Sequence, residues 1–135
     1  MSKRILVIDD EPGIRGMVRD VLAGAGYEVF PEGRPDVALK RLATESFDLV
    51  VSDYCMPGMP GDVLFAEMRR QFAAAGGEGG GTGPGRSAPP VIVMTGYGDE
   101  ERVRRWVAQP GVAGAIFKPF MIADLLTMVQ KALAG

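Results

Sequence analysis

Apolar residues recur along the chain in two alternating patterns: short continuous runs, and longer segments with one apolar face. Short runs, several of them rich in β-branched residues, predict buried strands over residues 3–8, 27–30, 49–52, 91–94 and 113–117. Between and after them, apolar residues at helical spacing predict helices over residues 14–25, 35–45, 63–72, 99–109 and 122–133. The chain therefore alternates strand and helix from one end to the other.

Strands that alternate with helices predict a parallel sheet, because parallel neighbours need helical crossovers. Right-handed crossovers place helices on both faces, so the predicted fold class is α/β with a doubly wound sheet. The pattern alone does not give the strand order. A flavodoxin-like order, 2-1-3-4-5, and a Rossmann-like order both fit it.

One stretch breaks the alternation. Residues 76–87 have seven glycines in their first ten positions, which predicts a flexible loop at about 74–89. Residues 80–87 come within one residue of a phosphate-binding P-loop, with Arg86 where that motif has lysine. A P-loop joins a strand to a following helix, whereas this stretch joins a helix to a strand, so we interpret it as a flexible insertion.

Composition narrows the class of protein. A chain of 135 residues that is 47% hydrophobic can bury one core but not two, so we expect a single domain over residues 1–135. A net charge of -2 disfavours direct nucleic-acid binding. The chain has one cysteine, Cys55, no signal peptide and no apolar stretch that could span a bilayer, so we expect a cytoplasmic protein without membrane association. With no histidine, any chemistry must rest on acids, hydroxyls and lysine.

Polar residues follow four of the five predicted strands at their carboxyl ends, where open α/β sheets bind ligands. Only the second strand ends in apolar residues, Phe30-Pro31. Taken singly, each polar residue fits an ordinary role, such as a helix cap, a solvated strand end or a surface lysine. Their shared position points to a site; they are Asp9, Asp10 and Glu11 after the first strand, Asp53 after the third, Thr95 after the fourth and Lys118 after the fifth.

The order 2-1-3-4-5 would bring Asp9, Asp10 and Asp53 into one small volume, since neighbouring strands lie about 5 Å apart. Three carboxylates this close repel one another, so either one binds a proton or a divalent cation neutralises them. Oxygen ligands without histidine or thiolate favour Mg²⁺. Thr95 and Lys118 can approach from the other side, which suits phosphoryl transfer to a carboxylate.

Four motifs, taken together and in this order, resemble the receiver domain of two-component response regulators. They are residues 5–11 (ILVIDDE), 53–61 (DYCMPGMPG), 94–97 (MTGY) and 117–120 (FKPF), and the resemblance covers the chain apart from the glycine-rich loop. It implies the flavodoxin-like order 2-1-3-4-5 with five helices. It also implies a signalling phosphoacceptor rather than an enzyme, one that phosphorylates itself from small phosphodonors and dephosphorylates itself.

The same resemblance implies a role for each site residue. Asp53 is expected to receive a phosphoryl group from the phosphohistidine of a sensor histidine kinase or from a phosphotransfer protein. Mg²⁺ would be bound by Asp10, by Asp53 and by the backbone carbonyl of Cys55, with Asp9 acting mainly through water. Thr95 and Lys118 would contact the phosphoryl group.

The family also typically has a cis bond between Lys118 and Pro119 and an aromatic residue three positions before the lysine. Here that position is Ala115, so the usual aromatic readout of phosphorylation is absent. We expect Tyr97 to move in its place when Thr95 shifts toward the phosphoryl group. The alternative is that Tyr97 is a fixed surface ring.

A basic surface is predicted on the fourth helix, which carries Arg102, Arg104, Arg105 and Trp106. In the family, the face made by the fourth helix, the fifth strand and the fifth helix commonly dimerises or docks an output partner. A homodimer or partner contact anchored by Trp106 and a merely solvated basic helix both fit this sequence. The chain ends soon after the last predicted helix, so we expect either a stand-alone receiver or a piece of a larger regulator or hybrid kinase.

Two other functions deserve comparison. A phosphatase of the haloacid dehalogenase type also uses a strand-end aspartate, Mg²⁺ and a lysine, but it would need a second aspartate at the position of Cys55. A scaffold that has kept the fold and lost the chemistry is disfavoured, because no expected site residue is missing. Phosphorylation of Asp53, with a consequent change in partner binding or dimerisation, remains the predicted function.

Overall fold

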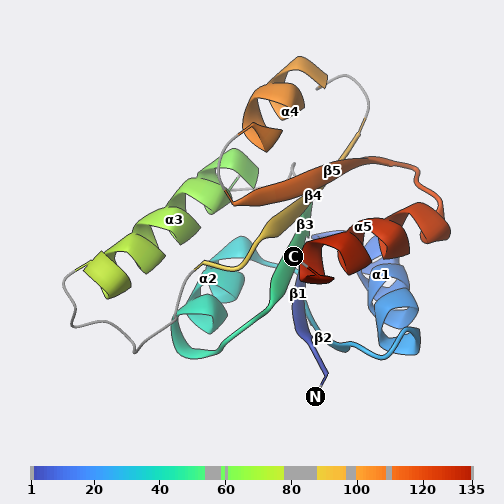
Figure 1. Ribbon diagram of the computed structural model, residues 1–135, viewed down its shortest axis with the longest axis horizontal. Helices are drawn as coiled ribbons and strands as arrows, with labels where there is room; N and C mark the ends of the chain where they lie inside the picture. The colour runs from blue at the N-terminus through green and yellow to red at the C-terminus, as the bar shows by residue number, and fades with distance from the viewer. Residues whose placement is uncertain are drawn as a thin grey trace.

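The fold is described from a computed structural model of the chain (Figure 1). It describes residues 2–53, 59, 61–77, 88–96, 100–108 and 111–134. Within these ranges, the side chains of residues 61, 62, 72–77, 100, 102 and 106 are left out of the description.

Strands and helices alternate along the described chain, as the hydrophobic pattern predicts. The strands are β1 (Arg4–Ile8), β2 (Glu28–Glu32), β3 (Leu49–Asp53), β4 (Val91–Gly96) and β5 (Val112–Lys118). The helices are α1 (Pro12–Gly24), α2 (Pro35–Thr44), α3 (Gly61–Gly77), α4 (Glu100–Val107) and α5 (Ile122–Ala134). Proline stands in the first turn of α1 and of α2, where its missing N–H costs no hydrogen bond.

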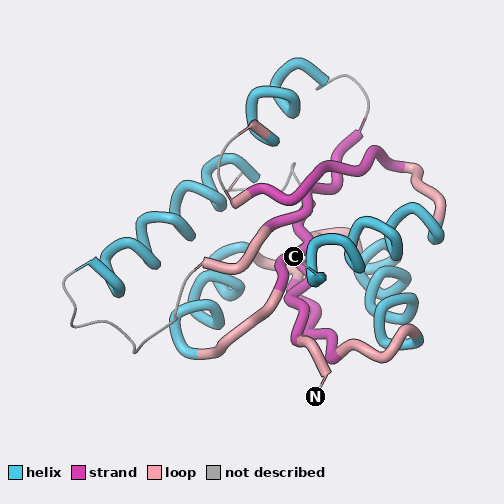
Figure 2. Tube along the Cα trace, in the orientation of Figure 1, coloured by secondary structure: helices cyan, strands magenta, loops and turns pink. Residues whose placement is uncertain are grey.

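The strands form one parallel sheet in the order β2-β1-β3-β4-β5. In Figure 2 they form a single band with helices on both sides. This confirms the flavodoxin-like order and excludes the Rossmann-like alternative. The order places β1 next to β3, so the segments that follow these two strands meet at one edge of the sheet.

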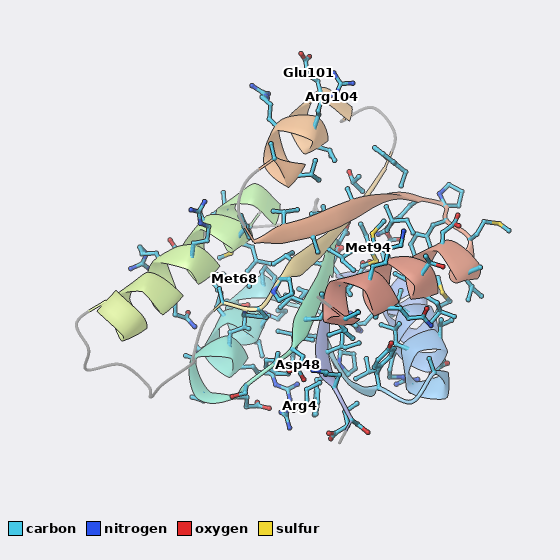
Figure 3. All side chains as sticks on the ribbon, viewed as in Figure 1. Arg4, Asp48, Met68, Met94, Glu101 and Arg104 are labelled. Atoms are coloured by element: carbon cyan, nitrogen blue, oxygen red, sulfur yellow. The ribbon has the colours of Figure 1, made fainter. Side chains whose placement is uncertain are left out.

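Two hydrophobic layers cover the sheet, one on each face. Helices α2 and α3 lie on one side, and α1 and α5 on the other (Figure 1). Met68 and Met94, labelled in Figure 3, belong to these two layers respectively. Successive strand residues alternate between the layers, so the central strands are apolar on both faces, as expected of a doubly wound sheet. Fully buried members include Leu6, Ile8, Leu42 and Val50 in the first layer and Ile5, Val7, Leu22, Leu49 and Leu125 in the second.

The second strand is longer than predicted and ends in a carboxylate. β2 continues through Pro31 to Glu32, so the expectation that it ends in Phe30-Pro31 is wrong. β2 is an edge strand, with β1 as its only neighbour. An edge strand tolerates proline, because only one of its sides has to supply ladder hydrogen bonds.

The third helix runs further than the glycine content suggests. α3 continues to Gly77, so residues 74–77 of the predicted loop are helical. Glycine weakens a helix without forbidding it, and a helix already underway adds residues more easily than it begins. Residues 78–87, the rest of the glycine-rich stretch, lie outside the described residues.

A glycine turn connects α1 to the edge strand. Gly26 has a φ of 100°, a conformation that strains any residue with a Cβ. Its N–H donates to the carbonyl of Ala23 at 3.1 Å, and the N–H of Tyr27 donates to the carbonyl of Leu22 at 3.2 Å. These bonds use carbonyls that the helix end leaves unpaired, and they direct the chain into β2.

Charged side chains stabilise the amino-terminal end of β1. The N–H of Arg4 donates to Asp48 Oδ2 at 2.7 Å, and both residues are labelled in Figure 3. The Arg4 guanidinium also donates to Glu45 Oε1 at 3.0 Å, and Arg41 Nε donates to Glu45 Oε2 at 2.9 Å. The hydrogen bond from Arg41 is the main reason that the pKa of Glu45 lies below its usual value; burial opposes it, and the charges of both arginines add to it.

No helix within the described ranges is both long enough and apolar enough to cross a bilayer.

Candidate functional site

The carboxyl ends of β1 and β3 bring three carboxylates together. Ile8 pairs with Ser52 in the last register of these neighbouring strands, and Asp9 and Asp53 are the next residues along. One carboxylate oxygen from each of Asp9, Asp10 and Asp53 lies within 4.8 Å of the others. The acidic cluster predicted from the strand ends is therefore present, and we refer to these three residues as the acidic cluster.

Two members of the acidic cluster are buried. Asp9 is 0% exposed and Asp53 is 5% exposed, whereas Asp10 lies partly open to solvent. Buried carboxylates that repel each other are costly unless a positive charge lies close to them. Lys118 is that charge: its Nζ lies 3.0 Å from Asp9 Oδ2 and 3.4 Å from Asp53 Oδ1.

The same contacts set the protonation of Lys118. Burial on its own would lower the pKa of Lys118, but the hydrogen bond to Asp9 and the charges of Asp53 and Asp9 act in the opposite direction. Their combined effect raises the pKa of Lys118 above its ordinary value. Lys118 therefore carries a full positive charge at neutral pH and can bind an anion.

Asp9 is held at both of its carboxylate oxygens. Oδ1 accepts a hydrogen bond from the N–H of Glu11 at 2.9 Å, and Oδ2 accepts one from Lys118 at 3.0 Å. The alternative interpretation of Asp9 and Asp10 as caps of the first helix does not hold, because Glu11 occupies the N-cap of α1. Asp9 thus forms an ion pair with Lys118 inside the cluster, and Asp10 is the member of the cluster most exposed to solvent.

Thr95 and Lys118 come from the neighbouring strands β4 and β5. Thr95 is 1% exposed, and its hydroxyl donates to the carbonyl of Gly96 at 3.3 Å. Gly96 pairs with Lys118 in the register of β4 and β5. The peptide bond between Lys118 and Pro119 is cis, as the family resemblance predicts.

The remaining predicted residues differ in what the structure describes. Cys55 and Tyr97 lie outside the described residues, as do the side chains of Arg102 and Trp106. Arg104 is exposed and points away from the sheet (Figure 3), and Arg105 is exposed as well.

The predicted switch position adjoins an open groove. Ala115 lies in β5 and packs against the core layer of α2 and α3. A groove of about 400 Å³ runs between α4 and β5 beside it, lined by Val103, Arg104, Val107, Gly114, Ala115 and Phe117. At position 115, this lining receives only a methyl group.

The donor set of the acidic cluster fits a hard divalent cation. Its described ligand atoms are all carboxylate oxygens, which Mg²⁺ and Ca²⁺ prefer to softer donors. The cluster has three negative charges against one lysine, so a cation would reduce the repulsion that remains. Asp10 and Asp53 are the described residues best placed to bind it, since Lys118 and Glu11 occupy both oxygens of Asp9.

Two residues near the site were given no role from the sequence. Glu11 Oε1 lies 3.5 Å from Lys118 Nζ, which makes it a third carboxylate around this lysine. Arg15, one helical turn further along, donates from Nη1 to the backbone carbonyl of Asp9 at 2.8 Å. Glu11 was noted only as a polar residue after the first strand, and nothing in the pattern indicated a backbone carbonyl as the target of Arg15.

The sheet order, the strand-end carboxylates and the lysine between them are the features on which the resemblance to a receiver domain rests. Comparison with known families agrees: residues 5–130 match the response regulator receiver domain. The chain belongs to this family.

The proteins to which this chain is similar include bacterial response regulators. It is 31% identical to the response regulator protein FleR of Pseudomonas aeruginosa, over all of this chain and 25% of FleR. It is 31% identical to the regulatory protein AtoC of Escherichia coli, over 96% of this chain and 25% of AtoC. The chain therefore spans about a quarter of the length of these curated relatives.

A solved structure supports the fold over nearly the full length. The response regulator protein TrrA of Thermotoga maritima, solved in complex with Mg²⁺-BeF, is 29% identical with a TM-score of 0.75. The match covers 97% of this chain and 99% of TrrA.

Proposed function

We propose that this chain is the phosphoacceptor of a two-component system, with Asp53 as the residue that is phosphorylated. The observation that carries the proposal is the position of Asp53: at the end of a buried strand, within 4.8 Å of two further carboxylates and 3.4 Å from Lys118. A carboxylate held among these charges can act as a nucleophile toward phosphorus, and a lysine beside it can stabilise the incoming phosphoryl oxygens.

The transfer follows from these positions. A carboxylate oxygen of Asp53 forms a bond to the phosphorus of a partner's phosphohistidine while the bond from phosphorus to the imidazole nitrogen breaks. The imidazole nitrogen keeps the electron pair of the broken bond. Lys118 interacts with a phosphoryl oxygen as charge builds up on it, and Thr95 supplies a hydroxyl donor from β4.

Mg²⁺ is the cofactor that we propose for this site; Asp10 and Asp53 would hold it, together with the backbone carbonyl of Cys55, a residue outside those described. When bound, it offsets negative charge on the phosphoryl oxygens and on the acidic cluster. TrrA, a similar receiver, has been solved in complex with Mg²⁺-BeF, which supports the same cofactor here.

Phosphorylation is then read out without the usual aromatic residue of β5. We propose that Thr95 moves toward the phosphoryl group and that Tyr97 moves with it toward the groove beside Ala115. The groove of about 400 Å³ is the observation that favours this route. An identical Tyr97 rotamer in crystals grown with and without a phosphoryl mimic would rule it out.

The proposed donor is a sensor histidine kinase or a phosphotransfer protein, which must dock beside Asp53. Two exposed apolar side chains follow Lys118 closely in the sequence, where α5 begins: Met121 is 69% exposed and Ile122 is 51% exposed. Large exposed apolar side chains next to a reaction site favour a protein partner. The face made by α4, β5 and α5, with Arg104 exposed on it, is the proposed surface for a homodimer or an output partner.

Intact mass after incubation with Mg²⁺ and acetyl phosphate distinguishes the candidate functions. A phosphoacceptor gains the mass of one phosphoryl group, and the Asp53→Asn variant gains none. A phosphatase would release phosphate continuously without accumulating a modified form. A scaffold without chemistry would leave both mass and acetyl phosphate unchanged.

We also propose that the chain forms a single domain and is located in the cytoplasm. It is not expected to contact nucleic acid directly or to associate with a membrane. We assign no enzymatic turnover of an external substrate to the chain; its chemistry is self-phosphorylation from phosphodonors and its own dephosphorylation.

A further inference from the structure

Arg15 contacts the backbone next to the acidic cluster rather than a carboxylate. It lies in α1, and its Nη1 donates to the carbonyl oxygen of Asp9 at 2.8 Å. That carbonyl belongs to the peptide group that joins Asp9 to Asp10. Because a peptide group is planar, fixing its oxygen also fixes the direction in which the Asp10 Cα leaves it.

Gly33 provides the space that the Arg15 guanidinium occupies. A Cβ at position 33 would lie 2.5 Å from Arg15 Nη1 and 3.2 Å from its Cζ. A Cβ would overlap the guanidinium, so the flexible Arg15 side chain would have to move away from its present position. The loop between β2 and α2 therefore packs directly on the guanidinium that holds the Asp9 carbonyl.

The other side of the Asp9 backbone is held by β2, the strand that leads into this loop. The N–H of Asp9 donates to the carbonyl of Glu32 at 3.1 Å, and Glu32 immediately precedes Gly33. Asp9 is thus fixed at its N–H by β2 and at its carbonyl by α1. With Glu11 and Lys118 on its carboxylate, every polar group of Asp9 has a partner.

We propose that Arg15 is a positioning residue: it orients Asp10 through the peptide group that joins Asp9 to Asp10, and Gly33 leaves the space that its guanidinium occupies. This deepens the proposed function, because the ligand that Asp10 serves is Mg²⁺. A carboxylate held in its binding orientation loses less freedom when it binds the metal, so the metal binds more tightly. Partners that orient metal ligands typically change metal affinity by about 10- to 100-fold.

A positioning role and a purely electrostatic role for Arg15 predict opposite effects on Mg²⁺ affinity when Arg15 is removed. Arg15 carries a positive charge near a cluster that attracts cations, so removing that charge alone would tighten Mg²⁺ binding. If Arg15 positions Asp10, removing it loosens the ligand and weakens Mg²⁺ binding. The sign of the change in affinity therefore separates the two explanations.

Three variants of the full chain separate contact from charge. Arg15→Met removes both the donor and the charge. Gly33→Ala keeps the charge and displaces the guanidinium. Arg19→Met is the matched control: it removes the same charge from the same helix, and Arg19 pairs with the exposed Asp20 instead.

Isothermal titration calorimetry with MgCl₂ gives the Kd for each variant, and urea denaturation in EDTA checks that each is folded. We expect Arg15→Met and Gly33→Ala to weaken Mg²⁺ binding on the order of tenfold. Arg19→Met should bind as the wild type does, and Arg15→Lys should recover part of the affinity. Wild-type affinity in either Arg15→Met or Gly33→Ala, or tighter binding in Arg15→Met, overturns the proposal.

A metal-free measurement keeps this inference separate from the proposed function. Amide hydrogen exchange in EDTA reports on the N–H of Glu11, which donates to Asp9 at 2.9 Å. We expect faster exchange in Arg15→Met and Gly33→Ala and no change in Arg19→Met; unchanged exchange in the first two overturns the positioning role. A wild type that binds no Mg²⁺ would instead contradict the proposed function, while the exchange data would still decide the role of Arg15.

Discussion

Repulsion within the acidic cluster should lower the free energy of unfolding of the metal-free protein. The Asp10→Asn variant, which removes one of the three charges, tests this. Asparagine has almost the same shape as aspartate and lacks the charge. Asp10 is the cluster member to change, because Asp9 is tied to Lys118 and Asp53 is the proposed acceptor. In the absence of metal, the substitution removes the repulsion of one carboxylate by two others.

The size of the effect follows from the separation. At 4.8 Å, the upper limit within the cluster, two unit charges repel by about 3.5 kcal/mol at an effective dielectric constant of about 20 and by about 0.9 kcal/mol in water. Asp10 is partly exposed, and Lys118 already offsets charge on its two neighbours. We therefore expect Asp10→Asn to raise the free energy of unfolding by about 1–2 kcal/mol in EDTA, which is about 4–7 °C in Tm.

Magnesium should reverse the difference in stability, so that the wild type becomes more stable than Asp10→Asn. The wild type gains about 2.7 kcal/mol when free Mg²⁺ is about 100 times its Kd, and Asp10→Asn should gain much less, because it has lost a ligand. The assay is urea denaturation of both proteins in EDTA and in MgCl₂. Asp20→Asn, an exposed carboxylate on α1, serves as the control and should behave as the wild type in both buffers.

A metal-free Asp10→Asn protein that is less stable than the wild type would refute the electrostatic reasoning. An equal gain from Mg²⁺ in both proteins would refute the assignment of Asp10 as a metal ligand.

Three further predictions concern the partner surface and the frame of the fold. Replacing Met121 or Ile122 with Glu should slow transfer from a phosphohistidine protein on the order of tenfold and leave acetyl phosphate labelling unchanged; equal slowing with both donors would exclude a docking role. The pKa of Glu45 is lowered in the folded state. The pairing of Glu45 with Arg41 therefore stabilises the protein at pH values above the unfolded pKa, and this stabilisation disappears as the pH falls through the folded pKa. The difference in urea midpoint between wild type and Glu45→Gln should therefore shrink from neutral pH to about pH 3; a constant difference would contradict this. Gly26→Ala should lower the free energy of unfolding by about 1–2 kcal/mol, measured by urea denaturation, and an unchanged midpoint would show that the turn tolerates a Cβ.

Much of the fold was predictable because the local pattern and the tertiary structure agree. The run before Asp9 is apolar from Ile5 to Ile8, and the run before Asp53 is apolar from Leu49 to Val51, which is what a strand covered on both faces requires. Their polar ends indicated the edge of the sheet at which a site would form. The strand order could not be derived from the pattern, because neighbours in the sheet are chosen by how the helices pack, and the family resemblance supplied it.

The mispredicted boundaries have physical causes. Pro31 argued against a strand, but its place at the edge of the sheet makes the missing N–H tolerable. Gly76 and Gly77 argued for a loop, yet α3 continues through both. In each case, context in the folded protein outweighed a local preference.

The role inferred for Arg15 could not have been predicted from spacing. Its partner is a backbone carbonyl, and every residue of the chain offers the same group. Only the folded chain brings α1, the end of β1 and Gly33 together. Side chains that act on the backbone near a site leave no compositional signal.

The central claim is that Asp53 accepts the phosphoryl group, and chemical mapping tests it most directly. Protein labelled with acetyl phosphate and Mg²⁺ is treated with borohydride, which reduces an aspartyl phosphate to homoserine, and is then digested and sequenced by mass spectrometry. The account predicts homoserine at position 53, in amounts that match the phosphoryl group gained and that fall to background in EDTA. Homoserine at position 9 or 10 instead, or a labelled protein without homoserine at position 53, would contradict it.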